Sequence, residues 1–443
     1  MTMGLPEILI NFTTSGLSAI ERSERGIVCL ILDEATPAGA HAYIDEMTDA
    51  SQIEATYYTA ANEAYIKMAF EGRPVKVIVV RKQTSAPLSV VAEADDDTFT
   101  AAAHGYQNGV VGQFTAAVLP TGISALTDYW IISRTDNTFK VSATKGGAAV
   151  EFSTDGTSVV FTPKVLTMAN CLAVAKPLKF NYLAAPYADN TDTGTIVSWI
   201  TARRDTDYMT VKAVVSAASG PDHEGVIDFQ TDGILTVDNN YANAATYTKR
   251  QFCPRIAGIL AGLSLSRSST YYVISEIEDA VASSDPDADI DAGKLILVYD
   301  GDNWKIGRGV NSLTTFTATY GEDNRKIKIV EGKDLIRDDI RGTFEASYIG
   351  KVINDYDNKI NFIAAINVYF RGLERSSVLD RRFANRADIS VELQRDYIEL
   401  QGEDPNDYTD QEIREYNTGS KVLLAASIKL VDAMEDLTLN ISM

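Results

Sequence analysis

Cysteine is rare in this chain, with three among 443 residues. Cys29, Cys171 and Cys253 are odd in number and widely spaced, and each lies in an apolar stretch such as Val28-Cys29-Leu30. A disulfide framework needs paired cysteines, so we expect three buried free thiols instead.

An excess of positive charge and a long hydrophobic run are also absent. The chain has 40 Lys and Arg against 61 Asp and Glu, a net charge of −21, which argues against binding of nucleic acid or of an anionic membrane. The longest nearly apolar run, residues 256–265, is about half as long as a membrane helix requires, and no signal-peptide pattern begins the chain. We therefore expect a cytoplasmic protein with no membrane insertion and no nucleic-acid partner.

Histidine is equally scarce, and motifs of catalysis are missing. Of His41, His104 and His223, only His223 is flanked by carboxylates, in Asp222-His223-Glu224. Adjacent residues of an extended chain point to opposite sides, so we expect a solvated loop histidine there. The sequence has no Gly-x-Ser-x-Gly nucleophile elbow and no phosphate-binding P-loop. It predicts no enzyme, no catalytic residue and no cofactor.

Alternating carboxylates in residues 285–291 form the strongest metal-binding candidate. A calcium-binding EF-hand loop requires Gly at its sixth position and Glu at its twelfth, where this chain has Ile290 and Ile296. We interpret the segment as a solvated linker and predict no metal site.

The composition that remains is that of a soluble globular protein. Hydrophobic residues make up 45% and charged residues 23%, and the length suggests about two to four domains. Gly26–Leu32 and Val75–Arg81 are continuous apolar runs typical of buried strands, and helix-spaced apolar residues fill Ala50–Phe70 between them. This order predicts a β-α-β unit.

The residue pattern changes from about Ser89 to Pro163, where segments of alternating apolar and polar residues are separated by turn signals. We predict strands at Gln113–Leu119, Tyr129–Arg134, Thr138–Thr144 and Ala149–Ser153. These segments indicate a small all-β module inserted into an α/β framework.

The framework then resumes with alternating helices and strands, which predicts a mainly parallel, covered sheet. Its predicted elements are a helix at 166–175, a strand at 180–184, a helix through 196–200, strands at 210–216 and 225–229, and a long helix that begins after Cys253-Pro254. Farther on, Asp300-Gly301 predicts a hairpin, helices are expected at Asp334–Asn354 and Lys359–Leu373, and a strand at 422–430.

Both ends of the chain contain a strand pattern with no adjacent hairpin partner. Ile8, Ile10 and Phe12 share one face near the start, and Leu437, Leu439, Ile441 and Met443 share one face at the end. Such strands must pair elsewhere. The bland alternative is that both pair within their own subunit.

Several segments together resemble the tail sheath proteins of contractile phages and phage-tail-like bacteriocins of the Gram-positive type. They are Leu5–Phe12, Ile20–Gly26, Tyr182–Ala184, Val197–Ile200, Asp222–Gly225, Ile306–Thr315 and Val431–Asp436. The resemblance implies a multi-domain α/β protein with a subtilisin-like α/β middle domain, subtilisin-like in topology only, and an α+β C-terminal sheath domain.

The expected domains are an N-terminal strand arm at 1–20, the first part of the framework at 21–88, the inserted β module at 89–165, the subtilisin-like domain at 166–291, the C-terminal sheath domain at 292–430 and a C-terminal strand arm at 431–443. The family implies that the arms donate strands to neighbouring subunits and join hexameric rings into a helical tube. The apolar arm residues would bond neighbours. Gly16, Asp432, Glu435 and Asp436 would act as hinges.

The resemblance also implies partners: other copies of the chain, a tail tube, and baseplate and tail terminator proteins. Lys333, Arg337 and Arg341 recur about one helical turn apart and are expected to face an acidic tube, although an exposed helix face would look the same. The implied function is contraction that drives the tube through a bacterial envelope, after assembly in the bacterial cytoplasm. The alternatives are a carbohydrate-binding or hydrolytic surface protein, or a non-contractile baseplate or capsid component.

Overall fold

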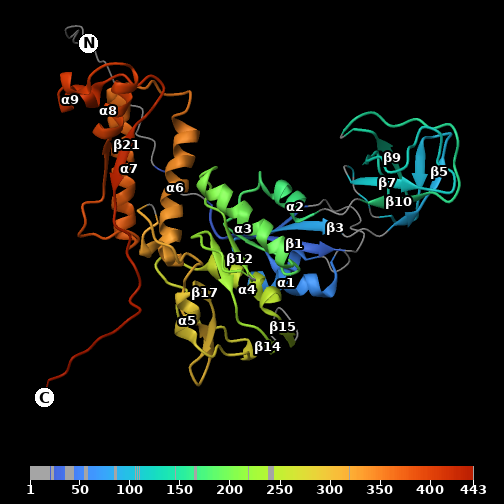
Figure 1. Cartoon of the computed structure of the whole chain (residues 1–443), viewed down its shortest axis with the longest axis horizontal. Coiled ribbons are helices and arrows are strands. Elements are labelled where there is room, and N and C mark those ends of the chain that lie inside the picture. Colours follow the sequence, from blue (N-terminus) through green and yellow to red (C-terminus); the bar gives the residue numbers. More distant parts are fainter. Residues whose placement is uncertain are drawn as a thin grey trace, which may run out of the picture. The chain divides into compact units, whose positions relative to one another are not determined.

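The computed structural model describes Ile20 and residues 24–34, 44–53, 58–83, 87–163, 167–237 and 244–442, apart from positions 105, 107, 109, 145, 218 and 319. The described residues form two compact units (Figure 1). The smaller unit contains Glu331–Asp432, and the larger contains Glu24–Val330 together with Ala433–Met443. From Glu24 onward, the chain therefore passes between units after Val330 and again after Asp432.

The larger unit is built on a seven-stranded sheet of order β17-β13-β12-β11-β1-β3-β2, parallel except at the β2 edge. Its strands are β1 (Ile27–Glu34), β2 (Ile44–Met47), β3 (Lys76–Gln83), β11 (Tyr182–Ala184), β12 (Lys212–Val215), β13 (Val226–Phe229) and β17 (Lys294–Leu295). The predicted β-α-β unit and the mainly parallel sheet are confirmed, since β1 pairs in parallel with both β3 and β11. The edge strand β2 was not predicted.

Helices cover both faces of this sheet, as the apolar runs in its strands require. Alternate residues of β1 point to opposite faces: Val28 and Leu30 pack toward α1 (Ala60–Glu71) and α4 (Lys249–Gly262). Cys29 and Ile31 pack toward α2 (Met168–Ala175) and α3 (Asn190–Asp205) on the other face. Figure 1 shows the two pairs of helices on opposite sides of β1 and β3. All three cysteines are buried and free, as predicted.

Helix α4 differs from its prediction, because it begins at Lys249 and runs through Pro254. The prediction placed its start after Pro254, since proline lacks an N–H group and usually opens a helix. Here Thr248 and Gln251 form a capping box one turn earlier, which supplies the start signal. Packing then holds the remaining turns: α4 contacts α1 where Gly72, Gly258 and Gly262 allow the backbones to meet.

Smaller elements complete the α/β body. They are the helical turns η1 (Ala50–Gln52) and η2 (Glu322–Arg325), the antiparallel sheet of β14 (Ile234–Thr236), β15 (Ala245–Tyr247) and β16 (Ile277–Asp279), helix α5 (Pro286–Asp291), and the hairpin of β18 (Leu297–Tyr299) and β19 (Trp304–Ile306). The hairpin at Asp300-Gly301 is confirmed. The linker predicted at 285–291 is wrong, because Asp285 caps a short helix by accepting a hydrogen bond from the N–H of Ala288.

Within residues 88–163 the described elements are all antiparallel strands. They are β4 (Leu88–Ser89), β5 (Val91–Glu93), β6 (Thr98–Thr100), β7 (Val111–Thr115), β8 (Tyr129–Ile132), β9 (Thr138–Ser142) and β10 (Val160–Pro163). Three of the predicted strands correspond to β7, β8 and β9. The strand predicted at Ala149–Ser153 is wrong, since this segment is irregular and buries Phe152 in the core.

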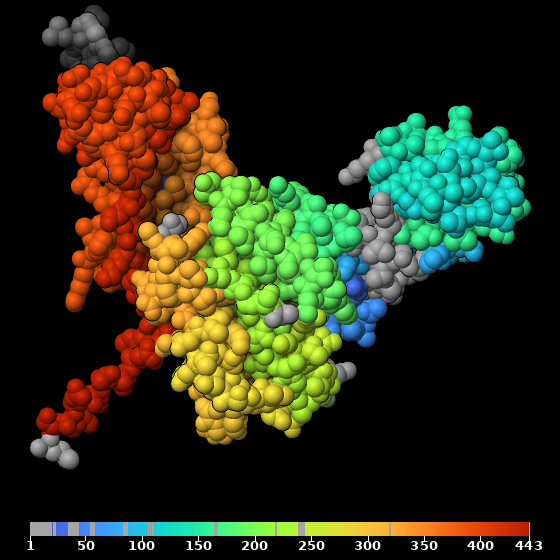
Figure 2. All heavy atoms as spheres, viewed as in Figure 1, coloured from blue at the N-terminus to red at the C-terminus, as the bar shows by residue number. Residues whose placement is uncertain are grey.

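The first two strands of this region close the sheet into a barrel. The sheet order is β4-β10-β7-β8-β9-β6-β5, and its two edge strands are consecutive in the chain. Residues 88–93 thus pair with β10 through one half and with β6 through the other. Stacked rings fill the barrel, with Phe99 and Phe114 centroids 4.5 Å apart. Figure 2 shows the outer surface of this region in cyan and blue-green. Among the described strands, closure leaves only short edges beside residues 88–93 for pairing with another chain.

The smaller unit consists of helices and a two-stranded antiparallel sheet. Its elements are most of α6 (Ile327–Ser347), α7 (Tyr356–Arg375), β20 (Arg386–Ile389), α8 (Val391–Leu400), η3 (Pro405–Asp407), α9 (Asp410–Glu415) and β21 (Leu424–Ser427). The two long helices were predicted, although α6 begins and ends about two turns earlier than expected. The strand predicted at 422–430 is confirmed as the shorter β21, extended by a bridge from Leu430 to Leu379.

Candidate assembly site

The C-terminal segment leaves the larger unit as an extended chain. Residues 437–442 contain no assigned strand, and the side chains of Leu437, Leu439 and Ile441 are 89%, 70% and 76% exposed. Figure 2 shows this end of the chain, in deep red, as a narrow file of atoms. Three large apolar side chains on one face of an extended segment favour a surface that becomes covered in an assembly.

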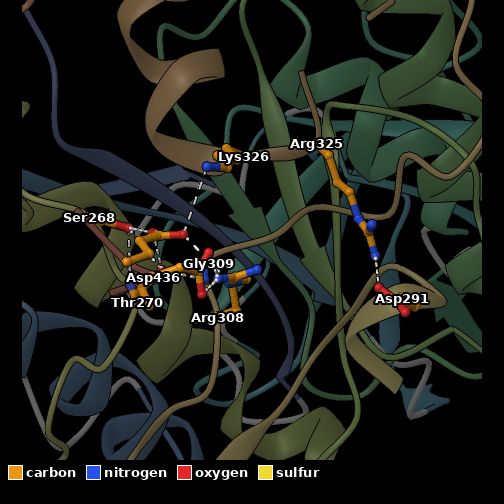
Figure 3. Close-up of polar contacts among 9 residues, drawn as sticks. Ser268, Thr270, Asp291, Arg308, Gly309, Arg325, Lys326 and Asp436 are labelled. Atoms are coloured by element: carbon orange, nitrogen blue, oxygen red, sulfur yellow. Dashed lines mark hydrogen bonds and ion pairs between the residues drawn. The ribbon is translucent and has the colours of Figure 1, made fainter. Parts of the chain in front are cut away.

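A polar socket holds the segment immediately before these residues. The side chain of Glu435 is only 7% exposed. Its Oε1 accepts hydrogen bonds from the hydroxyls of Ser268, at 3.0 Å, and Thr270, at 2.6 Å (Figure 3). Its Oε2 lies 3.5 Å from Arg308 Nε and 3.9 Å from Lys326 Nζ, and these two cations balance its charge.

Asp436 adds an outer ion pair to this socket. One guanidinium nitrogen of Arg308 donates to both Asp436 oxygens at 2.6 Å, and this hydrogen bonding raises the pKa of Arg308. Asp436 is 84% exposed, so solvent screens this pair far more than it screens Glu435. We call the six residues Ser268, Thr270, Arg308, Lys326, Glu435 and Asp436 the C-terminal clasp.

Contacts among residues 268–309 position the part of the clasp that does not belong to the C-terminal segment. The Thr270 hydroxyl accepts a hydrogen bond from the N–H of Gly309 at 2.9 Å, and a Cβ at Gly309 would lie 2.3 Å from the hydroxyl of Ser269. Tyr271 follows with φ +55°, a left-handed conformation that is costly for a bulky residue. The Gly309–Thr270 hydrogen bond therefore brings Arg308 and Thr270 close together, and a side chain at 309 would have to displace the Ser269 hydroxyl.

A second polar cluster fixes the loop that follows Gly309. The backbone of His223 exchanges hydrogen bonds with the Ser312 hydroxyl, and the His223 ring lies 3.2 Å from Asp205, which also accepts from Tyr320. His223 is 7% exposed, so the prediction of a solvated histidine is wrong. The chain around Ser312 and Tyr320 covers it, about ninety residues away in sequence. The Ser312 hydroxyl hydrogen-bonds the backbone of His223 and not its ring, so the cluster serves to hold the two loops together.

Other predicted site residues are partly described. Ile8, Ile10, Phe12 and Gly16 lie outside the described residues. Lys333, Arg337 and Arg341 lie on α6, and all three side chains are partly exposed. Asp432 is the last residue of the smaller unit, so it stands where the chain returns to the larger one.

The smaller unit also has an apolar groove of about 650 Å³. The end of α6, the start of α7 and residues 419–422 line it, with Tyr348, Ile353 and Phe362 among its walls. Lys359 also lines the groove. Burial lowers the pKa of its ammonium group, which donates a hydrogen bond to the Thr418 hydroxyl at 3.0 Å.

Among the described residues, no group of three or more His, Cys, Asp or Glu is placed to hold a metal ion. Two carboxylates of Asp285–Asp291 bind other groups: Asp285 accepts from the N–H of Ala288, and Asp289 accepts from Ser283 and Lys294. Within the same residues, no helix has the length and apolar character of a membrane span.

Comparisons with known proteins agree with this picture. The family model for the phage tail sheath C-terminal domain matches residues 319–443. The tail sheath protein of Clostridium phage phiCD119 is 36% identical over 268 residues, which cover 60% of this chain and 72% of that protein.

Two solved structures share the fold. The sheath tail protein of Desulfitobacterium hafniense has a TM-score of 0.60 at 18% identity, covering 87% of this chain and 94% of that one. The helical sheath of the anti-feeding prophage, in its contracted state, has a TM-score of 0.58 at 11% identity, covering 100% and 99%. With the extended C-terminal segment and the identity to the phage protein, these matches confirm the resemblance seen in the sequence: the chain belongs to the phage tail sheath protein family.

Proposed function

We propose that this sheath protein polymerises as stacked hexameric rings around a tail tube, and that contraction of the lattice drives the tube through a bacterial envelope. The observation that carries the proposal is the exposed apolar face of Leu437, Leu439 and Ile441 at the end of an extended chain. Such a segment leaves both its main-chain hydrogen-bonding groups and its alternate side chains available to a neighbour's sheet. The N-terminal residues Ile8, Ile10 and Phe12 would form a second arm of the same kind.

The proposed partners follow from the geometry of a sheath. Copies of the chain bind one another through the arms, and α6 presents Lys333, Arg337 and Arg341 toward the tail tube. Baseplate and tail terminator proteins would bind the ends of the cylinder. The net charge of −21 disfavours nucleic acid as a partner. We propose assembly in the bacterial cytoplasm before release within a phage tail or a phage-tail-like particle.

We also propose the finer division of the chain. The parallel sheet of the larger unit supports a subtilisin-like arrangement in topology only, as part of a protein that is not an enzyme. Residues 89–165 would form an inserted β module on the outer surface, since a module facing inward would obstruct the tube. Gly16 and Asp432 would act as joints of the two arms.

Electron microscopy of the purified protein tests the proposal. We expect striated hollow cylinders from the full chain and soluble, folded monomers from a chain that ends at Asp436. Deletion of residues 437–443 removes several main-chain hydrogen bonds at every lattice contact, each worth on the order of 1 kcal/mol. Closed shells from the full chain would favour a capsid component, and cylinders from the shortened chain would show that the C-terminal arm is not the polymerisation element.

A further inference from the structure

We infer that Glu435, supported by Asp436, anchors the root of the C-terminal arm to the larger unit, and that the movable joints lie on either side of this anchor. The inference rests on the proposed function, because it assigns the place where a neighbour's pull on the arm enters the subunit. It also changes the role expected from the sequence, in which both residues would be hinges.

Glu435 is buried more than the residues that flank it in the chain. The side chain of Glu435 is 7% exposed, whereas the residues Met434 before it and Leu437 after it are 103% and 89% exposed. A residue that turns freely would not bury a carboxylate, since burial of a charge is costly unless hydrogen bonds and opposite charges compensate it. Here two hydroxyls donate to Oε1, and two cations face Oε2 as ion pairs without a hydrogen bond to it.

The two carboxylates contribute unequally to the anchor. Glu435 lies where solvent screening is weak, and its partners come from two separate segments, Ser268–Thr270 and Arg308–Lys326. Asp436 lies in solvent, and exposed ion pairs contribute little to stability. Glu435 is therefore the principal residue that positions the root of the arm, and Asp436 holds the Arg308 side chain that faces Glu435.

The clasp also joins two parts of the larger unit between which the chain forms the smaller unit. Lys326 immediately precedes α6, through which the chain enters the smaller unit, and Glu435 follows Asp432, where the chain returns. Contact between Lys326 and Glu435 brings the exit and the re-entry together on the larger unit. Tension on the arm therefore passes directly to the α/β body and bypasses residues 331–432.

Hydrogen exchange of the full-length monomer tests the anchor directly. In Glu435→Ala, we expect the amides of Thr270 and Gly309 to exchange about tenfold faster or more. Their N–H groups donate to the hydroxyls of Ser268 and Thr270, and the Glu435 carboxylate holds both hydroxyls in place. Asp436→Ala should give a clearly smaller acceleration, since its ion pair is screened. The matched control is Glu278→Ala, an exposed glutamate on β16, which should exchange as wild type does. Wild-type exchange rates in Glu435→Ala would overturn the inference.

Assembly supplies a second readout. If the arm root must be fixed, Glu435→Ala should form cylinders with a yield reduced by about fivefold or more, since every lattice contact repeats the defect, while Glu278→Ala matches wild type. A wild-type yield from Glu435→Ala would show that the anchor is not needed for assembly. A wild-type chain that forms no cylinders would refute the proposed function, and the exchange experiment would still decide whether Glu435 is an anchor.

Discussion

Gly258 occupies a point of helix contact where no side chain fits. A Cβ at this position would lie 2.1 Å from the carbonyl oxygen of Ala69, on the backbone of α1. Backbone atoms cannot turn aside as a flexible side chain does, so α1 and α4 would have to separate. We expect Gly258→Ala to lower the free energy of unfolding by on the order of 3 kcal/mol, measured by urea unfolding with far-ultraviolet circular dichroism.

The control for this substitution is Gly194→Ala in α3. No atom outside the helix backbone lies within 4 Å of a Cβ at Gly194, so alanine should stabilise that helix by about 0.5–1 kcal/mol. If the two variants had equal stability, the close approach of α1 and α4 would not be the reason for glycine at 258.

His104 predicts a dependence of barrel stability on pH. Its Nδ1 accepts a hydrogen bond from the N–H of Tyr106 at 3.0 Å, so Nε2 carries the proton and donates to the carbonyl of Thr138 at 3.3 Å. Burial lowers the pKa of His104 from its usual 6.5. The unfolded chain therefore takes up a proton before the folded one, and stability should fall as pH drops below 6.5 toward the folded-state pKa.

The pH experiment compares residues 87–163, expressed alone, with the same fragment carrying His104→Gln. We expect the wild-type melting temperature to fall more than that of the variant between about pH 7.5 and about pH 5. Carboxylates titrate in both fragments, so the difference between the two slopes isolates the histidine. Parallel slopes would mean that His104 takes up its proton equally in the folded and unfolded states.

Contacts between residues far apart in the chain could not be predicted from the sequence. Ser268 and Glu435 are 167 positions apart, and neither residue type implies a socket. The family resemblance pointed to the runs that contain Arg308 and Glu435, but it did not pair them. His223 was misjudged for the same reason, because the residues that bury it come from a distant loop.

At the scale of elements, the sequence predicted strands best where both faces are buried. β1 and β3 read as continuous apolar runs because helices cover them on both sides. β2 was missed because Ile44-Asp45-Glu46-Met47 is short and carries two carboxylates at a sheet edge. The closure of the barrel was missed because residues 88–93 divide their pairing between two partners, which a local pattern does not reveal.

The barrel should be separable from the rest of the larger unit. Its core cluster shares no residue with the two clusters on the faces of the parallel sheet. We expect replacement of residues 89–165 by a short Gly-Ser linker to preserve both folding and cylinder formation, and the fragment 87–163 to fold alone. Circular dichroism and electron microscopy measure these outcomes. A linker variant that fails to fold would show that the barrel supports the sheet beside β3.

At the scale of the whole molecule, the chain runs from the larger unit to the smaller and returns to end as an extended segment. The return at Ala433–Met443 means that the proposed arm belongs to the larger unit, although 102 residues of the other unit, Glu331–Asp432, precede it. The sequence predicted the arm from its alternation of apolar and polar residues. It could not show which unit holds the arm, because that depends on the clasp.

Alternation along the arm gives a test of how it binds. If the arm adds to a neighbour's sheet, Leu439 and Ile441 face the neighbour's core, while Thr438 and Asn440 face away. The double variant Leu439→Asp with Ile441→Asp should abolish cylinders, since each buried carboxylate would cost on the order of 2 kcal/mol or more at every contact. The matched variant Thr438→Asp with Asn440→Asp adds the same charge and should still assemble. All four side chains are exposed in the monomer, so both variants should unfold as wild type does. Negative-stain microscopy and sedimentation measure the assembled fraction, and equal losses in the two variants would mean that net charge, and not a strand register, governs the contact.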